Sequence, residues 1–291
     1  MVGRSCALCG GTNNVTREHV YPSWFLKRWD ATAAVDGPFS TKINGVELLR
    51  RDGAIATNPR IGRVMLDLCQ SANGCLNTAF ELPAKDPVRR LLDEGSPLLS
   101  PDEVHHLARW MVKTLLLAAH PASEHTAFAS RRVNKKNTNS PWLDYSKKIA
   151  DALEAGRLPD DATLWVAVTG PNGQPDPDYE PVYLRHTTRA DDEGGTGHVR
   201  TTGFNLLGGD RMVLFQLVHH PLHDLTHPFR GTGTVTQLWP NAPAALDLST
   251  HRLLDHATRL SHVFLESGFS QGLRAGERSV GNGLPWMQWN P

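Results

Sequence analysis

The sequence predicts an α+β protein in which a small cysteine-bearing amino-terminal module packs on a larger domain of helices and an antiparallel sheet. Three observations predict this class. All 4 cysteines lie before residue 76, a long amphipathic helix follows them, and several segments of alternating apolar residues come after it. We place the boundary near residue 95, which gives a module over 1–95 and a second domain over 96–291 whose role the sequence does not indicate.

The composition is that of a folded protein with a substantial core. Hydrophobic residues make up 40% of the 291 residues and charged residues 21%, as in ordinary globular domains. No apolar run approaches the roughly 18 residues that span a bilayer, and the first residues lack the apolar stretch of a signal peptide. We therefore expect a soluble cytoplasmic protein with no membrane partner, and the oligomeric state stays open.

The second domain is expected to begin with helices over 100–156. Ser100-Pro101-Asp102-Glu103 is a capping box with proline at the first helical position. Behind it, apolar residues recur at the spacing of one helix face: Val104, Leu107, Ala108, Met111, Val112, Leu115, Leu116 and Ala119. A further helix is expected from Trp142 to Gly156.

Alternating apolar residues predict strands over 163–219. Gly-, Asp- and Pro-rich turns separate them, and such connections favour an antiparallel sheet over parallel βαβ winding. A last helix is expected over 250–267, ending before Gly268. The expected strands are Thr163 to Thr169, Pro181 to Thr187, Val199 to Leu206 and Arg211 to His219.

The cysteines predict a metal site. Cys6 and Cys9 precede the glycine turn Gly10-Gly11, which is typical of a zinc knuckle, and Cys69 and Cys75 form a second pair downstream. Disulfides are the alternative, with three pairings open, but thiols in a reducing cytosol are more often metal ligands. We expect one structural Zn²⁺ on all of these cysteines.

A strand that ends at a ligand cysteine gives the module its predicted shape. The run from Ile61 to Leu68 leads directly into Cys69, and the segment that follows carries Asn73 and Asn77. If that segment is helical, side chains at this spacing share one face. A strand, a cysteine and a helix in this order are what a ββα-metal or treble-clef site requires.

An acidic residue beside a histidine adds candidate catalytic chemistry between the two cysteine pairs. His19 can take a proton from water near neutral pH, and Glu18, with amide oxygens of Asn73 and Asn77, can hold a divalent ion that stabilises charge on a phosphate. Because successive strand residues point to opposite faces, Glu18 and His19 reach one ion only if the strand is strongly twisted or bulged. The alternative is that all of these residues are structural.

These segments resemble the HNH endonuclease superfamily, and most closely bacterial and phage proteins with a "REHV-P-W" start and a "C-x-x-C-N-N-G-W" second half. The matching residues are Thr16 through Trp24 and Cys69 through Asn77, within about the first 85 residues. The resemblance implies a ββα-metal nuclease that hydrolyses DNA, with RNA as the alternative substrate. It implies that His19 is the general base and that Glu18 and Asn73 bind a catalytic Mg²⁺ or other divalent ion, with Asn77 one turn further along.

Two departures from this pattern lie in the second half. The family's fourth cysteine would stand where this chain has Ala72, so Cys75, one helical turn on, would have to replace it. The asparagine that orients the base in the family has no clear match, and Asn44 and Asn58 are candidates only by their order along the chain.

Net charge leaves other functions open. Lys+Arg and Asp+Glu are 30 each, so contact with nucleic acid would depend on local basic groups such as 131–136, Lys147-Lys148 and Arg89-Arg90. The main alternative function is a non-catalytic zinc-containing module that binds nucleic acid or protein through a degenerate HNH motif. Another is a zinc hydrolase built on the histidines between His219 and His227.

Overall fold

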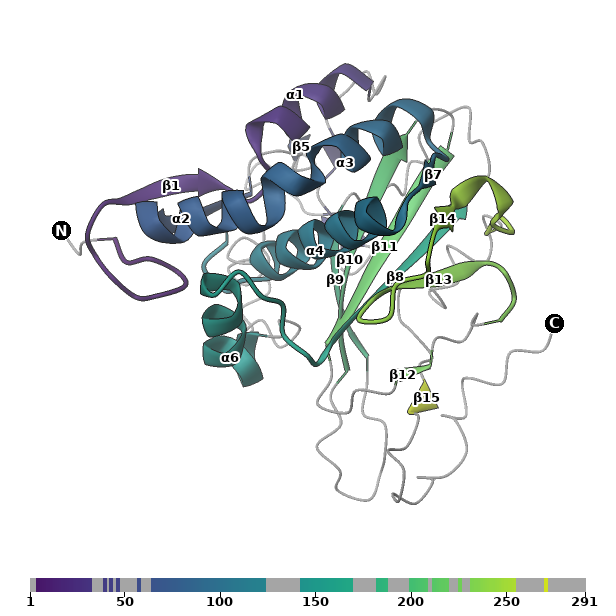
Figure 1. Ribbon diagram of the computed structural model, residues 1–291. Coiled ribbons are helices and arrows are strands. Elements are labelled where there is room, and N and C mark those ends of the chain that lie inside the picture. Colours follow the sequence, from purple (N-terminus) through teal and green to yellow (C-terminus); the bar gives the residue numbers. More distant parts are fainter. Residues whose placement is uncertain are drawn as a thin grey trace.

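The computed structural model describes residues 4–32, 39–40, 42–43, 46–47, 57–58, 64–123, 142–169, 182–187, 199–208, 211–219, 225–226, 231–254 and 270–271. It has a mixed α+β fold in which helices lie against a five-stranded antiparallel sheet (Figure 1). Several sequence predictions fall outside the described residues: the basic stretch 131–136, Asn44, and most of the histidine cluster after His219.

A two-stranded antiparallel ribbon forms the amino-terminal part. Strand β1 (Val15–His19) pairs with β6 (Met65–Cys69), from Val15 opposite Cys69 to His19 opposite Met65. On β6, buried Leu66 and Leu68 alternate with half-buried neighbours, which is the pattern of a strand with one face on a core. The predicted strand leading into Cys69 is therefore confirmed from Met65 onward, with Val64 preceding the ladder, and residues 61–63 lie outside the described part of the chain.

A nearly continuous helical stretch follows the ribbon. Helix α2 (Gln70–Leu76) passes into a π-helix, η1 (Asn77–Glu81), and then into α3 (Leu82–Glu94). Gly95 ends it with φ +71°, a left-handed value that glycine adopts without steric cost. One buried stripe runs through the stretch: Ala72, Leu76, Phe80, Ala84, Val88, Leu91 and Leu92.

The capping box starts helix α4 (Pro101–Ala118) as predicted. The Ser100 backbone N–H donates to the Glu103 carboxylate at 2.8 Å, and the Ser100 hydroxyl accepts from the Glu103 N–H at 3.4 Å. Helix α6 (Trp142–Glu154) also lies where a helix was predicted. The Trp142 indole N–H donates to the Leu116 carbonyl at 2.7 Å and so ties α6 to α4.

The sheet has the strand order β13-β8-β11-β10-β9, and every pair in it is antiparallel. The predicted strands are confirmed to within a few residues at their ends: β8 (Ala162–Thr169), β9 (Val182–Thr187), β10 (Val199–Gly208) and β11 (Arg211–His219). Strand β13 (Val235–Trp239) was not predicted. Helix α4 packs on this sheet, and α3 packs on α4.

The remaining elements are short, apart from helix α1 (Ser23–Thr32). They are β2 (Phe39–Ser40), β3 (Lys42–Ile43), β4 (Val46–Glu47), β5 (Thr57–Asn58), β7 (Leu98–Leu99), β12 (Leu225–Thr226), β14 (Leu246–Asp247), the 3-10 helix η2 (Leu248–Thr250) and β15 (Ser270–Gln271).

The predicted helix over 250–267 does not begin where expected. Thr250 ends η2, and His251 has extended backbone angles, φ −66° and ψ 134°. Asp247 explains the early turn, since its carboxylate accepts from the Ser249 N–H at 3.0 Å and caps this short helix instead. Residues 255–267 lie outside the described part of the chain.

One hydrophobic cluster extends across the predicted boundary near residue 95. Its buried members run from Cys6 in the amino-terminal loop to Leu248 after the sheet. The two regions also share an ion pair, because Lys113 of α4, fully buried, lies 2.8 Å from the Glu81 carboxylate of η1. No helix among the described residues is long and apolar enough to cross a membrane.

Glu81→Gln should destabilise the protein by about 3–5 kcal/mol, because it leaves the Lys113 ammonium buried without a counter-charge. The double variant Glu81→Gln/Lys113→Met should recover much of that loss, since no buried charge remains. Urea unfolding followed by circular dichroism measures both. Lys147→Met is the matched control: it breaks an exposed pair with Asp151 and should destabilise the protein far less, because solvent screens an exposed ion pair. Equal effects of the buried and exposed changes would contradict this account.

Candidate metal centre

The first two thiols sit on a tight loop before β1. The Cys6 N–H donates to the Gly11 carbonyl at 2.8 Å, and the Gly10 N–H donates to the Cys6 carbonyl at 2.9 Å. Gly10 has φ +72°, which the turn requires and which glycine adopts at low cost. The Ala7 N–H donates to the Asp67 carbonyl at 2.8 Å, so the loop is fixed to strand β6.

The third thiol comes from the junction between β6 and α2. Cys69 is the N-cap residue of α2, and its sulfur accepts a hydrogen bond from the Ala72 N–H at 3.5 Å. The first backbone N–H groups of a helix have no partner within the helix, and one of them is directed at this sulfur. The strand pairing determines where the thiol lies, because β6 ends beside the loop that carries the other two.

The three sulfur atoms have the spacing of a zinc site. Cys6, Cys9 and Cys69 place their Sγ atoms within 4.8 Å of one another, and the Cys9 and Cys69 sulfurs are 3.7 Å apart. Zinc–sulfur bonds of about 2.3 Å in a tetrahedron put ligand sulfurs about 3.8 Å apart. The three thiols can therefore hold one Zn²⁺ with little rearrangement.

The thiols have opposed tendencies to ionise. Burial opposes ionisation of Cys6, but backbone N–H groups of Cys69, Cys9 and Leu8 outweigh it and lower the Cys6 pKa. At Cys9 the Gly11 N–H favours the thiolate, yet the hydrogen bond with Cys6, burial and the neighbouring sulfurs together raise its pKa to about 11. Three thiolates this close repel one another, and a bound cation removes that repulsion.

Cys75 lies apart from these three thiols, whereas the sequence predicted a four-cysteine site. Its sulfur lies against helix α6 and donates to the carbonyl of Glu154 at 3.0 Å. Among the described histidine, cysteine and acidic residues, the metal-binding group consists of Cys6, Cys9 and Cys69 alone. The physical reason is helical phase: six residues after Cys69, Cys75 lies on the flank of α2 that packs on α6.

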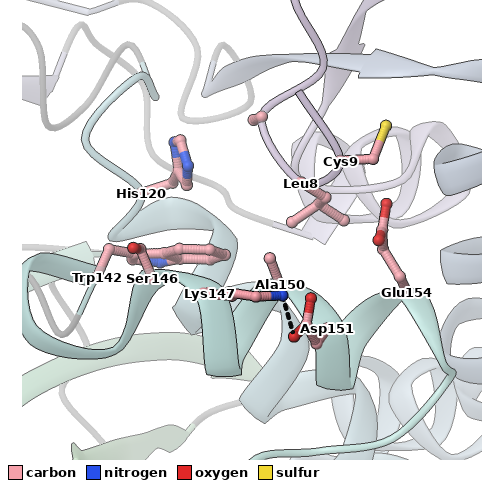
Figure 2. Close-up of a pocket in the computed structure, with 10 residues that line it drawn as sticks. Leu8, Cys9, His120, Trp142, Ser146, Lys147, Ala150, Asp151 and Glu154 are labelled. Atoms are coloured by element: carbon pink, nitrogen blue, oxygen red, sulfur yellow. Dashed lines mark hydrogen bonds and ion pairs between the residues drawn. The ribbon is translucent and has the colours of Figure 1, made fainter. Parts of the chain in front are cut away.

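A cavity of about 410 Å³ opens beside the thiol loop, between it and α6. Figure 2 shows Leu8 and Cys9 above it, and Lys147, Asp151 and Glu154 rising from α6 below. His120, from the end of α4, lines another side. Neither His120 nor Glu154 was a predicted site residue, and the sequence carries no spacing signal for them, since the packing of α6 alone brings them here.

His120 links the loop to the second region. Its Nδ1 accepts from the Ala122 N–H at 3.0 Å, the imidazole also hydrogen-bonds the Ala7 backbone, and the ring packs edge-on against Trp142 with centroids 4.4 Å apart. Burial lowers the His120 pKa to about 4, against a smaller opposing effect of the Ala7 backbone. The imidazole is therefore neutral near pH 7, with both nitrogens in use.

Glu18 and His19 lie at the end of β1 away from the thiols. The ladder from Val15 to His19 has one unshifted register. Glu18 therefore shares a ribbon face with buried Leu66, and exposed His19 points to the other face. The bulge that would direct both side chains to one ion is absent from these described pairs. The Glu18 carboxylate accepts a short hydrogen bond from the Thr16 hydroxyl.

Asn73 and Asn77 lie on one flank of the helical stretch. An α-helix turns about 100° per residue, which places both asparagines to one side of the buried residues Ala72 and Leu76. Cys75 lies on the other side of them, toward α6. Asn73 is half-buried and Asn77 is exposed. Asn58, in β5, has no described side chain.

The remaining basic candidates have acidic partners. Lys147 and Lys148 pair with Asp151 and Asp161 at 2.8 and 3.0 Å. Arg90 lies 2.7 Å from Glu103, and Arg89 lies 3.9 Å from Asp86. These groups therefore do not form a strongly basic patch.

No protein-family model, no curated protein and no solved structure matches this chain. Its function is therefore inferred from its own residues.

Purified protein should contain one zinc per chain, and Cys9→Ser should contain well under one, because it removes one of three ligands. Cys75→Ala should retain the metal, since its sulfur contacts α6 and not the thiol group. Elemental analysis after gel filtration measures this, with circular dichroism to compare the folds. Zinc loss in Cys75→Ala with the fold intact would show that Cys75 is a ligand after all.

The free energy of unfolding should fall as the pH drops from about 6.5 to about 4, by up to about 1.4 kcal/mol per pH unit from His120. The folded-state pKa of His120 is the lower one, so in this window the unfolded chain binds more protons and acid favours it. His120→Gln cannot titrate and should show a smaller slope. Both proteins are unfolded with urea in the same buffers, so the contribution of the thiols to the pH dependence cancels in the comparison. Equal pH dependence of the free energy of unfolding would contradict the low pKa assigned to His120.

Proposed function

We propose that this chain is a metal-dependent endonuclease of the HNH type that hydrolyses phosphodiester bonds of DNA. Zinc on the three thiols would be a structural ion, and a second divalent ion, such as Mg²⁺, would bind to Glu18 with Asn73 or Asn77. The observation that supports the proposal is a β-ribbon and a helix joined at a cysteine, with Glu18 on the ribbon face of buried Leu66 and with α2 in contact with both strands.

The strand faces support Glu18 as an ion ligand. Leu66 and Leu68 are buried, and α2 contacts both strands of the ribbon. Glu18 pairs with Leu66, so its side chain leaves the ribbon on that same face. A half-buried carboxylate beside a helix with two amide side chains provides hard oxygen ligands, which Mg²⁺ prefers.

The distances of Glu18 along the ribbon and of the two asparagines along the helix also support this ligand set. Helix α2 starts at Cys69 and lies along β1 (Figure 1). Glu18 is about 10 Å along the ribbon from the level of Cys69, at about 3.3 Å per strand residue. Asn73 and Asn77 are about 6 and 12 Å along the helix, at 1.5 Å per residue. Glu18 is thus level with the stretch between the two asparagines, closer to Asn77.

In the proposed reaction, His19 accepts a proton from a water molecule whose oxygen attacks phosphorus, and the bond to the 3′ or 5′ oxygen breaks. The ion neutralises charge on the phosphate and the leaving oxygen. His19 is the last residue of β1 and is exposed, so solvent and substrate can reach its imidazole. Arg17 shares its ribbon face and adds a cation two residues away.

A second candidate is a non-catalytic, zinc-stapled binding module. The unshifted register of β1 favours it, because that register directs His19 away from the face that carries Glu18. The hydrogen bond from Thr16 gives Glu18 a structural role that needs no ion. In this case the loop and ribbon would recognise a partner through shape and charge without cutting it.

His19→Ala should lower the rate of plasmid nicking by about 10²- to 10⁴-fold, the usual contribution of a general base. Nicking of supercoiled plasmid with Mg²⁺, Mn²⁺ or Ni²⁺, quantified on agarose gels, measures it. Zinc content should not change, because His19 is at the opposite end of the ribbon from the thiols.

His105→Ala is the control, since this exposed histidine lies on α4 away from the ribbon. If the wild-type protein cleaves DNA and RNA no faster than His19→Ala with any of the three ions, the nuclease proposal is wrong and the binding module is the function. If His105→Ala lowers the nicking rate as much as His19→Ala does, His19 has no specific role in cleavage.

A further inference from the structure

The three-thiol group has an open position on the side of helix α6. A tetrahedral zinc ion needs a fourth donor, and one helical turn after Cys69 the chain has Ala72. Its N–H bonds the Cys69 sulfur, but its side chain is a buried methyl group with no ligand atom. The fourth ligand must therefore come from another element or from solvent.

Helix α6 lies against this open side. Ala72 and Cys75 are three residues apart, so they share a flank of α2. The Cys75 sulfur lies 3.0 Å from the Glu154 carbonyl and 3.9 Å from that of Leu153. The carboxyl-terminal turn of α6 therefore packs beside the flank of α2 from which a ligand at position 72 would project.

We propose that the carboxylate of Glu154 is the fourth ligand of the metal ion at Cys6, Cys9 and Cys69. Glu154 and Cys9 line the same cavity, and in Figure 2 the Glu154 side chain extends from α6 toward Cys9. The cavity gives the carboxylate room to move onto the ion by rotation about its side-chain bonds.

The charges around Glu154 fit this role better than those around its neighbour. Asp151, one turn earlier on α6, is held by Lys147 at 2.8 Å. The Lys147 charge also acts on Glu154, but among the hydrogen bonds and ion pairs given for the described residues none is made by the Glu154 carboxylate. A carboxylate in the last turn of a helix is also disfavoured by the helix dipole, and a cation bound there offsets this effect.

Glu154 would replace the missing thiolate without changing the charge of the centre. Three thiolates and one carboxylate around Zn²⁺ carry the same net charge as four thiolates, and Zn–O bonds of about 2.0–2.2 Å are ordinary for carboxylates. The ion would also join the amino-terminal ribbon to α6, so metal binding would depend on residues far beyond position 95. This inference concerns metal binding and does not depend on nuclease activity.

The test is a competition of Co²⁺ and Zn²⁺ for the full-length protein against a chelator of known affinity, read from the cobalt absorption spectrum. Glu154→Gln should weaken zinc binding by about 10- to 100-fold or more, at least the effect of losing an outer hydrogen-bond partner. Asp151→Asn is the matched control and should leave the affinity unchanged. Ala72→Cys should raise the sulfur-to-cobalt charge-transfer absorption. In that variant, adding Glu154→Gln should leave the zinc affinity unchanged.

Unchanged zinc affinity and an unchanged cobalt spectrum in Glu154→Gln would overturn the proposal and leave water as the fourth ligand. A loss in Asp151→Asn as large as in Glu154→Gln would overturn the choice of residue. Circular dichroism of each variant shows whether it folds, and the Ala72→Cys spectrum gives an independent reading if Glu154→Gln does not. Because cleavage is not measured, these outcomes are separate from those for His19.

Discussion

The amino-terminal part of this fold is built around three sulfur atoms that lie within 4.8 Å of one another. In the loop that carries the first two thiols, Cys6 and Leu8 are buried, whereas Cys9 is exposed. Backbone hydrogen bonds shape the loop, but thiols this close cannot all ionise without a cation. One bound ion would change that repulsion into attraction and would fix the loop to the junction of β6 and α2.

The other end of the site is fixed by α4. Arg109 donates to the carbonyls of Gly156 at 2.6 Å and Ala79 at 3.5 Å, and its guanidinium lies 4.9 Å from the centre of the Phe80 ring. Lys113, one turn after Arg109 on α4, pairs with Glu81 at the end of η1. The π-helix between these contacts contains one wider turn, which is common at functional sites. Asn73 and Asn77 thus lie on a helical stretch that begins at the thiol Cys69 and that α4 contacts at η1.

Local signals in the sequence were sufficient for much of this arrangement. The capping box at Ser100 defines α4, the alternation of apolar residues defines β8 to β11, and the run before Cys69 defines β6, because each pattern contains its own physical cause. Three of the predicted zinc ligands come together for the same reason, since a knuckle and a strand end are local features. Helices α1 and α3, the π-helix η1 and strand β13 were not predicted, as their stability comes from packing on distant elements.

Tertiary packing decided the rest of the candidate site. Cys75 was grouped with the other cysteines by its spacing, but α6 occupies its flank of α2 and binds its thiol through the Glu154 carbonyl. His120 and Glu154 approach the thiols only because α4 and α6 end there. Glu18 and His19 were expected to reach one ion only if the strand is bulged or strongly twisted. The strand register is unshifted, so their side chains leave the ribbon on opposite faces.

The zinc K-edge X-ray absorption spectrum of the metal-loaded full-length protein tests the three-thiol centre most directly, because it counts the donor atoms around the ion. The account predicts three sulfur atoms at about 2.3 Å and one oxygen at about 2.0–2.2 Å. A shell of four sulfurs would mean that Cys75 leaves α6 to bind the metal, and a shell without sulfur would place the ion elsewhere. Either result would contradict the account.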